Sequence, residues 1–204
     1  TRQRFFIRQH TVELTHAYPS LEVHFTLDGS EPSFSSPRYQ EPFVISESTT
    51  VKASFFTENG NLRGGVCQSI YERITPLTAD AGPDTLKRGL CYRYYPGAFE
   101  VLPDFGKLTP SVDSSTMTFD VKGLTLKEDH FALQFEGWIR IPAEGVYEFY
   151  TISDDGSALY VGEKMVVDNN GSHSARKRTG TIALTQGYHP IRIDYFEDYS
   201  SQLL

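Results

Sequence analysis

With 204 residues, the chain is long enough for one large domain or two modest ones, each with its own hydrophobic core. Hydrophobic residues make up 39% of it and aromatic residues 13%, as in folded proteins, while 16 glycines and 11 prolines favour short strands joined by turns. The net charge of -7 argues against binding to nucleic acid, and no apolar stretch is long enough to span a membrane.

The first part of the chain, residues 1–74, is predicted to form one small β domain. Its short β-branched runs each end at Gly, Pro, Ser or Asn, with the spacing of about 8–12 residues that is found in sandwiches. These runs are TVELTH, LEVHFTLDG, PFVIS and TTVKASFFTENG. Residues 75–88 then contain two prolines, a glycine and no apolar periodicity, which predicts an exposed linker between two domains.

Residues 89–204 contain a second series of predicted strands. In DHFALQFEGWIRIP, alternating apolar residues predict a strand with one buried face. The runs EGVYEFYTI, SALYV, KMVVD, GTIAL and HPIRIDYF follow without helical periodicity. We therefore expect an all-β chain made of two antiparallel β-sandwich modules.

The segment SDDGSALYVGEKMVVDNNG, residues 153–171, is predicted to be a hairpin. Two residues, Gly-Glu, separate its apolar runs, which suits a two-residue turn and pairs Val161 with Lys164. Counting outward from that pair gives Leu159 opposite Val166, Ser157 opposite Asp168, and Asp155 opposite Asn170.

The open end of this hairpin is a candidate metal site, because oxygen-bearing side chains gather there. They are Asp154, Asp155, Asp168, Asn169 and Asn170. Hard oxygen donors suit calcium, which takes about 6–8 oxygen ligands, whereas zinc prefers His or Cys. Alternatively, Asp-Asp-Gly and Asp-Asn-Asn-Gly are turn sequences whose side chains bond to nearby backbone, since EF-hand spacing is absent. The residues alone leave both interpretations open.

Two further side chains are candidates for ligand binding. Trp138 lies on the polar face of its strand, in register with Gln134, Glu136 and Arg140. We expect Trp138 to be at least half exposed, either as a platform for a sugar ring or as an ordinary surface residue. His173 lies near the acidic segment, where it is either a ligand contact or an exposed loop residue.

No catalytic residue is predicted. The adjacent carboxylates Glu197 and Asp198 should point to opposite faces of a strand, so they do not flank one substrate bond. GxSxG, HExxH and phosphate-binding glycine motifs are absent from the sequence. Cys67 and Cys91 lack metal-site spacing, which leaves one disulfide or two free thiols.

Residues 89–204 resemble the lectin-like sandwich first described in anthrax protective antigen, the PA14 domain. The resemblance rests on GLCYRYYPG, FEGWIRIPAEGVYEFYTISDDGSALYVGEKMVVDNNGSH and LTQGYHPIRIDYFED. In the yeast adhesins of that family, an adjacent Asp pair joined by a cis peptide binds a calcium ion that holds sugar hydroxyls, and an Asn completes the site.

The resemblance therefore implies a calcium-dependent carbohydrate site in this chain. Its metal ligands would be Asp154 and Asp155 with Asn169 or Asn170. The candidates for further ligand contacts, Asp168, His173 and Trp138, come from their positions in the sequence and not from the resemblance. The resemblance also implies a last strand that continues past Leu204. In anthrax protective antigen itself the domain has no known lectin role, which leaves a structural reading open.

Residues 11 to about 74 resemble the small immunoglobulin-like module at the C-terminal end of chitobiases and β-hexosaminidases, through VHFTLDGSEPSFSSPRYQEPFVISESTTVKASFF. Together the resemblances imply a non-catalytic, glycan-binding accessory region of a bacterial β-N-acetylhexosaminidase, with the catalytic domain upstream of Thr1. They also imply a secreted, periplasmic or cell-surface location. The alternatives are a spacer or docking module without glycan affinity, or a wall of the parent enzyme's active site.

Overall fold

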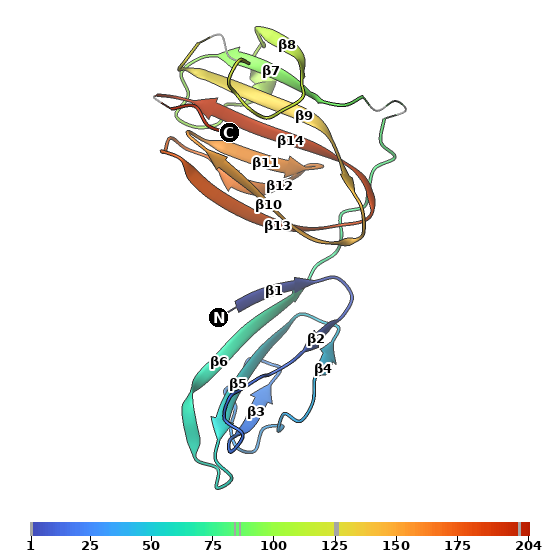
Figure 1. The fold of residues 1–204 in the computed structure, drawn as a ribbon, viewed down its shortest axis with the longest axis vertical. Coiled ribbons are helices and arrows are strands. Elements are labelled where there is room, and N and C mark those ends of the chain that lie inside the picture. The colour runs from blue at the N-terminus through green and yellow to red at the C-terminus, as the bar shows by residue number, and fades with distance from the viewer. Residues whose placement is uncertain (1, 84, 86, 125–126, 200) are drawn as a thin grey trace. The chain divides into compact units, whose positions relative to one another are not determined.

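The computed structural model describes residues 2–83, 85, 87–124, 127–199 and 201–204. Their regular structure is β-strand apart from one 3₁₀ turn, η1 (Phe105–Lys107), so the all-β prediction is confirmed. The chain divides into two compact units, Thr1–Thr75 and Pro76–Leu204, which Figure 1 colours from blue to teal and from green to red. The described residues include no helix with the length and apolar character needed to cross a bilayer.

The first unit combines a four-stranded sheet with a two-stranded one (Figure 1). The larger sheet has the order β1-β6-β5-β3 and is formed by β1 (Arg2–Phe6), β3 (Glu22–Thr26), β5 (Thr49–Phe56) and β6 (Leu62–Arg73). The smaller sheet pairs β2 (His10–Val12) with β4 (Phe43–Ile45). Both sheets contribute to one buried cluster, formed by Phe6, Val12, Ile45, Val51 and Tyr71.

The second unit contains a six-stranded antiparallel sheet of order β12-β11-β14-β9-β7-β8. Its strands are β7 (Leu90–Pro96), β8 (Val112–Thr116), β9 (Phe131–Ile141), β11 (Ser157–Val161), β12 (Lys164–Asn169) and β14 (Gly187–Glu197). A second sheet pairs β10 (Gly145–Ser153) with β13 (Arg176–Leu184).

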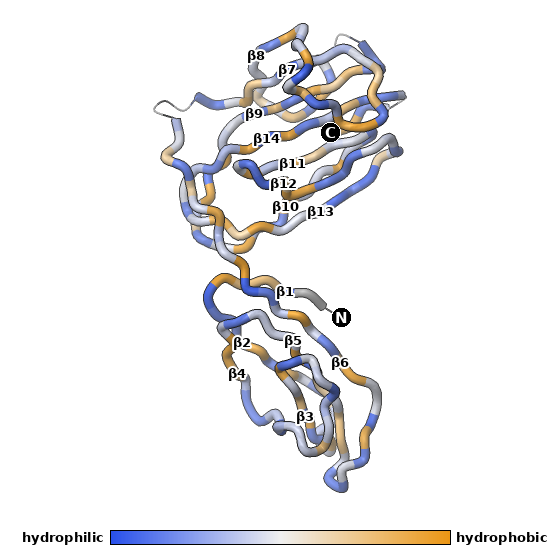
Figure 2. Tube along the Cα trace, turned by 180° about the vertical axis from the view of Figure 1, so that it is seen from behind, coloured by the Kyte–Doolittle hydropathy of each residue, from blue (hydrophilic) through white to orange (hydrophobic). Residues whose placement is uncertain are grey.

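The core of the second unit is supplied by alternating residues of both sheets, as expected from strand periodicity. Phe131, Leu133 and Phe135 of β9 pack in one buried cluster with Ile182 and Leu184 of β13. Figure 2 shows the corresponding mixture of hydrophobic and hydrophilic colour along β9, β14 and β11. The opposite face of the six-stranded sheet carries the polar side chains of Arg93, Gln134, Glu136, Arg192 and Asp194, beside a smaller buried cluster of Tyr95, Ala132 and Phe196.

The hairpin of β11 and β12 has the predicted turn but not the predicted register. Val161 pairs with Lys164 as expected. Beyond that pair a bulge between Leu159 and Tyr160 shifts the partners, so that Leu159 lies opposite Val167 and Ser157 opposite Asn169. A bulge inserts one extra residue and exchanges the two faces of the strand beyond it. Asn169, rather than Asp168, is consequently the buried residue at the open end.

The segment expected to be an exposed linker is partly attached to the second unit. The Leu77 amide donates to the Ala183 carbonyl at 2.8 Å, and the Asp80 amide donates to the Tyr188 carbonyl at 2.9 Å. Backbone groups near a sheet edge gain hydrogen bonds by pairing with it, and composition does not reveal this. Cys67 and Cys91 are free thiols.

Candidate functional site

The side chain of Asp155 lies at the centre of the open end of the hairpin. It is buried, with 5% of its surface exposed. One carboxylate oxygen accepts a hydrogen bond from the His173 amide at 2.8 Å, and the other accepts from the amides of Asp198 (2.9 Å) and Tyr199 (3.4 Å). Asp155 therefore joins two loops that are far apart in the sequence.

Asp154 belongs to the same group but is only partly buried. Its Oδ2 accepts from the Ala175 amide at 3.1 Å, and its backbone pairs with Leu203. The peptide bond between Asp154 and Asp155 is cis, as the resemblance implies. We call these two carboxylates, with the backbone amides that they accept from, the Asp-Asp site.

Asn169 is fully buried, and its amide group is occupied by neighbours within the protein. Its nitrogen donates to the Ser153 hydroxyl at 2.9 Å and to the Arg176 carbonyl at 3.0 Å. Its Oδ1 accepts from Nε of Arg176 at 2.8 Å. The oxygen that calcium would use therefore already faces a guanidinium.

The remaining residues predicted at this end of the hairpin mostly stabilise the loop itself. Asp168 is exposed and accepts from the Asn170 amide at 3.1 Å. Asn170 Oδ1 accepts from the amides of Leu102 (2.7 Å) and Gly171 (2.8 Å). The Asp168 contact is that of an Asx turn, whereas the Leu102 amide belongs to a segment far away in the sequence, so Asn170 ties its loop to that segment.

His173 bridges two backbone carbonyls of its own loop. Nδ1 of the ring lies 2.9 Å from the Ser174 carbonyl, and Nε2 lies 2.9 Å from the Asn169 carbonyl. Both nitrogens are therefore engaged within the loop, and the backbone amide of the same residue donates to Asp155. His173 thus helps to hold the loop that contacts Asp155.

A buried glutamate lies behind the Asp-Asp site. The Tyr195 hydroxyl lies 2.5 Å from the Asp154 carbonyl and 2.6 Å from Glu197 Oε2. A phenol has one proton, so a neutral Glu197 that donates to the tyrosine oxygen satisfies both contacts. Burial, together with the nearby negative charges of Asp155 and Asp154, raises the pKa of Glu197 to about 7, against the lowering effect of the Tyr195 hydrogen bond.

The donor set at this end fits calcium through the Asp pair and not through Asn169. The carboxylate oxygens are hard donors with lone pairs left after each backbone contact. Asn169 would first have to lose Arg176. No group of three or more His, Cys, Asp or Glu side chains suitable for a metal occurs among the described residues. The calcium site therefore remains a prediction that depends on Asp154 and Asp155.

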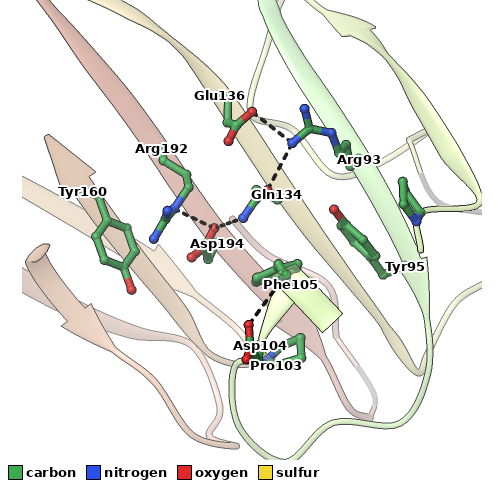
Figure 3. Close-up of a pocket in the computed structure, with 12 residues that line it drawn as sticks. Arg93, Tyr95, Pro103, Asp104, Phe105, Gln134, Glu136, Tyr160, Arg192 and Asp194 are labelled. Atoms are coloured by element: carbon green, nitrogen blue, oxygen red, sulfur yellow. Dashed lines mark hydrogen bonds and ion pairs between the residues drawn. The ribbon is translucent and has the colours of Figure 1, made fainter. Parts of the chain in front are cut away.

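Trp138 lies away from the Asp-Asp site, on the polar face of the six-stranded sheet. The expectation that it is at least half exposed is wrong, because it is partly buried in the wall of a cavity of about 710 Å³. Arg93, Glu136 and Arg192 line both this cavity and a neighbouring one of about 510 Å³, which Figure 3 shows. The structure therefore does not bring Trp138 together with the carboxylates.

Sequence reasoning missed four residues around the Asp-Asp site, namely Arg176, Tyr195, Glu197 and Asp198. The charged run ARKR, residues 175–178, has the composition of a solvated loop, and nothing in it marks Arg176 as the partner of Asn169. Glu197 continues the alternation of β14 with Tyr195, which is a signal that it is buried.

Both units of the chain match known domain families. Residues 4–64 match the chitobiase/beta-hexosaminidase C-terminal domain. A beta-hexosaminidase from Porphyromonas gingivalis (strain ATCC BAA-308 / W83) is 24% identical over 181 residues, which cover 84% of this chain and 22% of that protein. The chain thus spans about a fifth of this relative's length. These matches confirm the resemblance to a hexosaminidase C-terminal region that the sequence motifs indicate.

Among solved structures, a beta-glucosidase from Kluyveromyces marxianus in complex with glucose has a TM-score of 0.39 at 17% identity, over 52% of this chain and 14% of that one. An anti-sigma factor domain-containing protein has a TM-score of 0.45 at 16% identity, over 95% of this chain and 79% of that one. Residues 86–204 match the PA14 domain, and the chain belongs to that family.

Proposed function

We propose that this chain is a non-catalytic accessory region of a glycoside hydrolase, of the β-N-acetylhexosaminidase type, and that it binds carbohydrate at the Asp-Asp site with calcium. The beta-hexosaminidase relative and the chitobiase-type domain support the parent enzyme class. The partner would be a glycan, and the catalytic domain would lie upstream in the same polypeptide. An enzyme that reaches extracellular glycans would be secreted, periplasmic or on the cell surface.

One observation carries the proposal. Asp154 and Asp155 lie where three segments meet, and the backbone amides of residues 173, 175, 198 and 199 fix their carboxylates. Loops held in this way position oxygen donors before any ligand arrives, which lowers the entropic cost of binding. When bound, calcium would supply a Lewis-acid centre for vicinal sugar hydroxyls, and these two residues would hold it.

A structural role for the same residues is the second candidate. Two observations support it. Both oxygens of Asp155 already accept hydrogen bonds from the chain's own backbone, and the Arg176 side chain already donates a hydrogen bond to Asn169 Oδ1. On this view the Asp pair fastens the loops of a spacer or docking module and has no glycan affinity.

A glycan array distinguishes the two candidates. The whole chain is applied with calcium and then with a chelator, and Asp154→Ala is compared with Glu163→Ala, which removes an exposed acid at the opposite end of the hairpin. Glycan binding that calcium supports, that Asp154→Ala loses and that Glu163→Ala keeps is the expected result. Absence of binding under all conditions would favour the spacer.

A further inference from the structure

The polar face of the six-stranded sheet holds a continuous network of side chains, which we call the sheet-face network. Its members are Arg93 on β7, Gln134 and Glu136 on β9, and Arg192 and Asp194 on β14 (Figure 3). The strand register places Arg93 and Asp194 directly beside Gln134 on either side, and Arg192 beside Glu136. Its positions are therefore set by the sheet rather than by loops.

The members of the network are joined to one another. Arg93 donates to Glu136 at 3.0 Å and to Gln134 at 3.3 Å. The Gln134 amide donates to Asp194 Oδ1 at 3.0 Å, and Nε of Arg192 lies 3.3 Å from the same oxygen. Each guanidinium thus has a carboxylate partner. Because the paired charges offset one another, the network favours neither an anionic nor a cationic ligand.

Asp194 and Gln134 are unusual for residues on the solvent side of a sheet. They are only 4% and 8% exposed, yet they line the open 510 Å³ cavity. Burial raises the pKa of Asp194, against the lowering effects of Gln134 and Arg192. A buried carboxylate at the base of a cavity is costly for stability, and such groups gather at functional sites.

Aromatic rings lie at both ends of the network. The Arg192 guanidinium lies 3.9 Å from the ring centre of Tyr160, and Tyr95 packs edge-on against Phe105 at 5.1 Å. Figure 3 shows Tyr160 on one side of the polar row and Tyr95 with Phe105 on the other. Trp138 lines the adjoining 710 Å³ cavity, which shares Arg93, Glu136 and Arg192.

We infer that this pair of adjoining cavities is a second glycan site, which binds a neutral oligosaccharide across the sheet without calcium. Pyranose rings offer hydroxyls that donate and accept, which match the alternating donors and acceptors of the network. Their apolar faces pack on aromatic rings, and Trp138, Tyr160 and Phe105 are partly exposed, whereas Tyr95 is only 4% exposed and supports Phe105 from beneath. Both cavities have the size typical of small-molecule sites. The inference rests on the proposed carbohydrate-binding function but uses none of the residues of the Asp-Asp site.

The chain's single tryptophan provides the test. Chitotetraose, cellotetraose and mannotetraose are titrated separately into the ¹⁵N-labelled whole chain in EDTA, and the indole N–H resonance of Trp138 is followed. We expect a saturable shift with at least one of them. Arg192→Ala should weaken that affinity about tenfold, because it removes charged hydrogen bonds and the support of Tyr160. The control Arg178→Ala, an exposed arginine of β13, should leave the affinity unchanged.

An indole resonance that none of the three sugars moves would overturn the inference, as would equal affinity in Arg192→Ala and wild type. If the glycan array still shows calcium-dependent binding that Asp154→Ala abolishes, only the second site is wrong. If the array is blank as well, the proposed carbohydrate-binding function fails with it.

Discussion

The Asp-Asp site and the sheet-face network are both rich in carboxylates, but they are held in opposite ways. In the first, side chains accept hydrogen bonds from backbone amides of loops at residues 173–175 and 198–199. In the second, side chains bond to side chains across paired strands. Residues of the Asp-Asp site should therefore support the local backbone, whereas residues of the network can change while the sheet stays intact.

The largest effect is expected from Asp155→Ala. This change leaves three backbone amides near a buried position without their acceptor, and we expect it to destabilise the second unit by about 3 kcal/mol. The melting temperature should then fall by about 10 °C. Asp155→Asn, which keeps a carbonyl acceptor, should lose less. Calorimetry of the three proteins measures both, and equal stability of Asp155→Ala and wild type would refute the loop-fastening role.

The second prediction concerns the pH dependence of stability, which should report on Glu197, the buried glutamate behind the Asp-Asp site. Burial raises the pKa of Glu197 from its ordinary value of 4.5 to about 7. Between these values the folded protein holds a proton that the unfolded chain has released, so stability should decrease as pH rises from about 5 to 7 and then level off. Urea midpoints measured across this range should follow that slope.

The matching control for this slope is Glu197→Gln, which cannot ionise and can still donate to the Tyr195 oxygen. Its midpoints should lose the part of the slope between pH 5 and 7. If the urea midpoints of wild type and Glu197→Gln change with pH in the same way, the slope is due to other groups.

The smallest effect on stability is expected within the network. The Arg93 side chain is one-third exposed at 33%, and its partners Asp113 and Glu136 are more exposed still. Exposed ion pairs contribute little, so Arg93→Ala should cost under about 1 kcal/mol. Chemical denaturation measures this directly. A loss as large as that of Asp155→Ala would mean that the network is structural, and the contrast between the two regions would disappear.

Much of the fold can be predicted from the sequence pattern, whereas only some residues of the two sites can. Alternation in β9 predicts Phe131, Leu133 and Phe135 as buried, and the two-residue turn predicts the Val161–Lys164 pair. The bulge at Leu159 and Tyr160 has no local signature, and it exchanges the positions of Asp168 and Asn169. Local pattern thus locates an element more readily than it fixes which side chain turns inward.

The sheet-face network was only half visible in the sequence. Gln134, Glu136 and Trp138 are recognisable as one face of one strand by alternation. Their partners Arg93 and Arg192 come from strands whose order, β7-β9-β14, depends on tertiary packing. That order cannot be derived from periodicity within a strand, so the contacts across it could not be predicted.

The central claim is that the Asp-Asp site binds a ligand and does not only fasten loops. The most direct test of this claim is whether calcium stabilises the protein. Melting of wild type and of Asp154→Asn, which keeps an acceptor for the Ala175 amide but loses the charge, is measured with calcium and with magnesium. At about 100 times its dissociation constant, calcium should stabilise the wild type by about 2.7 kcal/mol, or roughly 8 °C, and leave Asp154→Asn unchanged. An identical calcium response in the two proteins, or none in either, would contradict the claim.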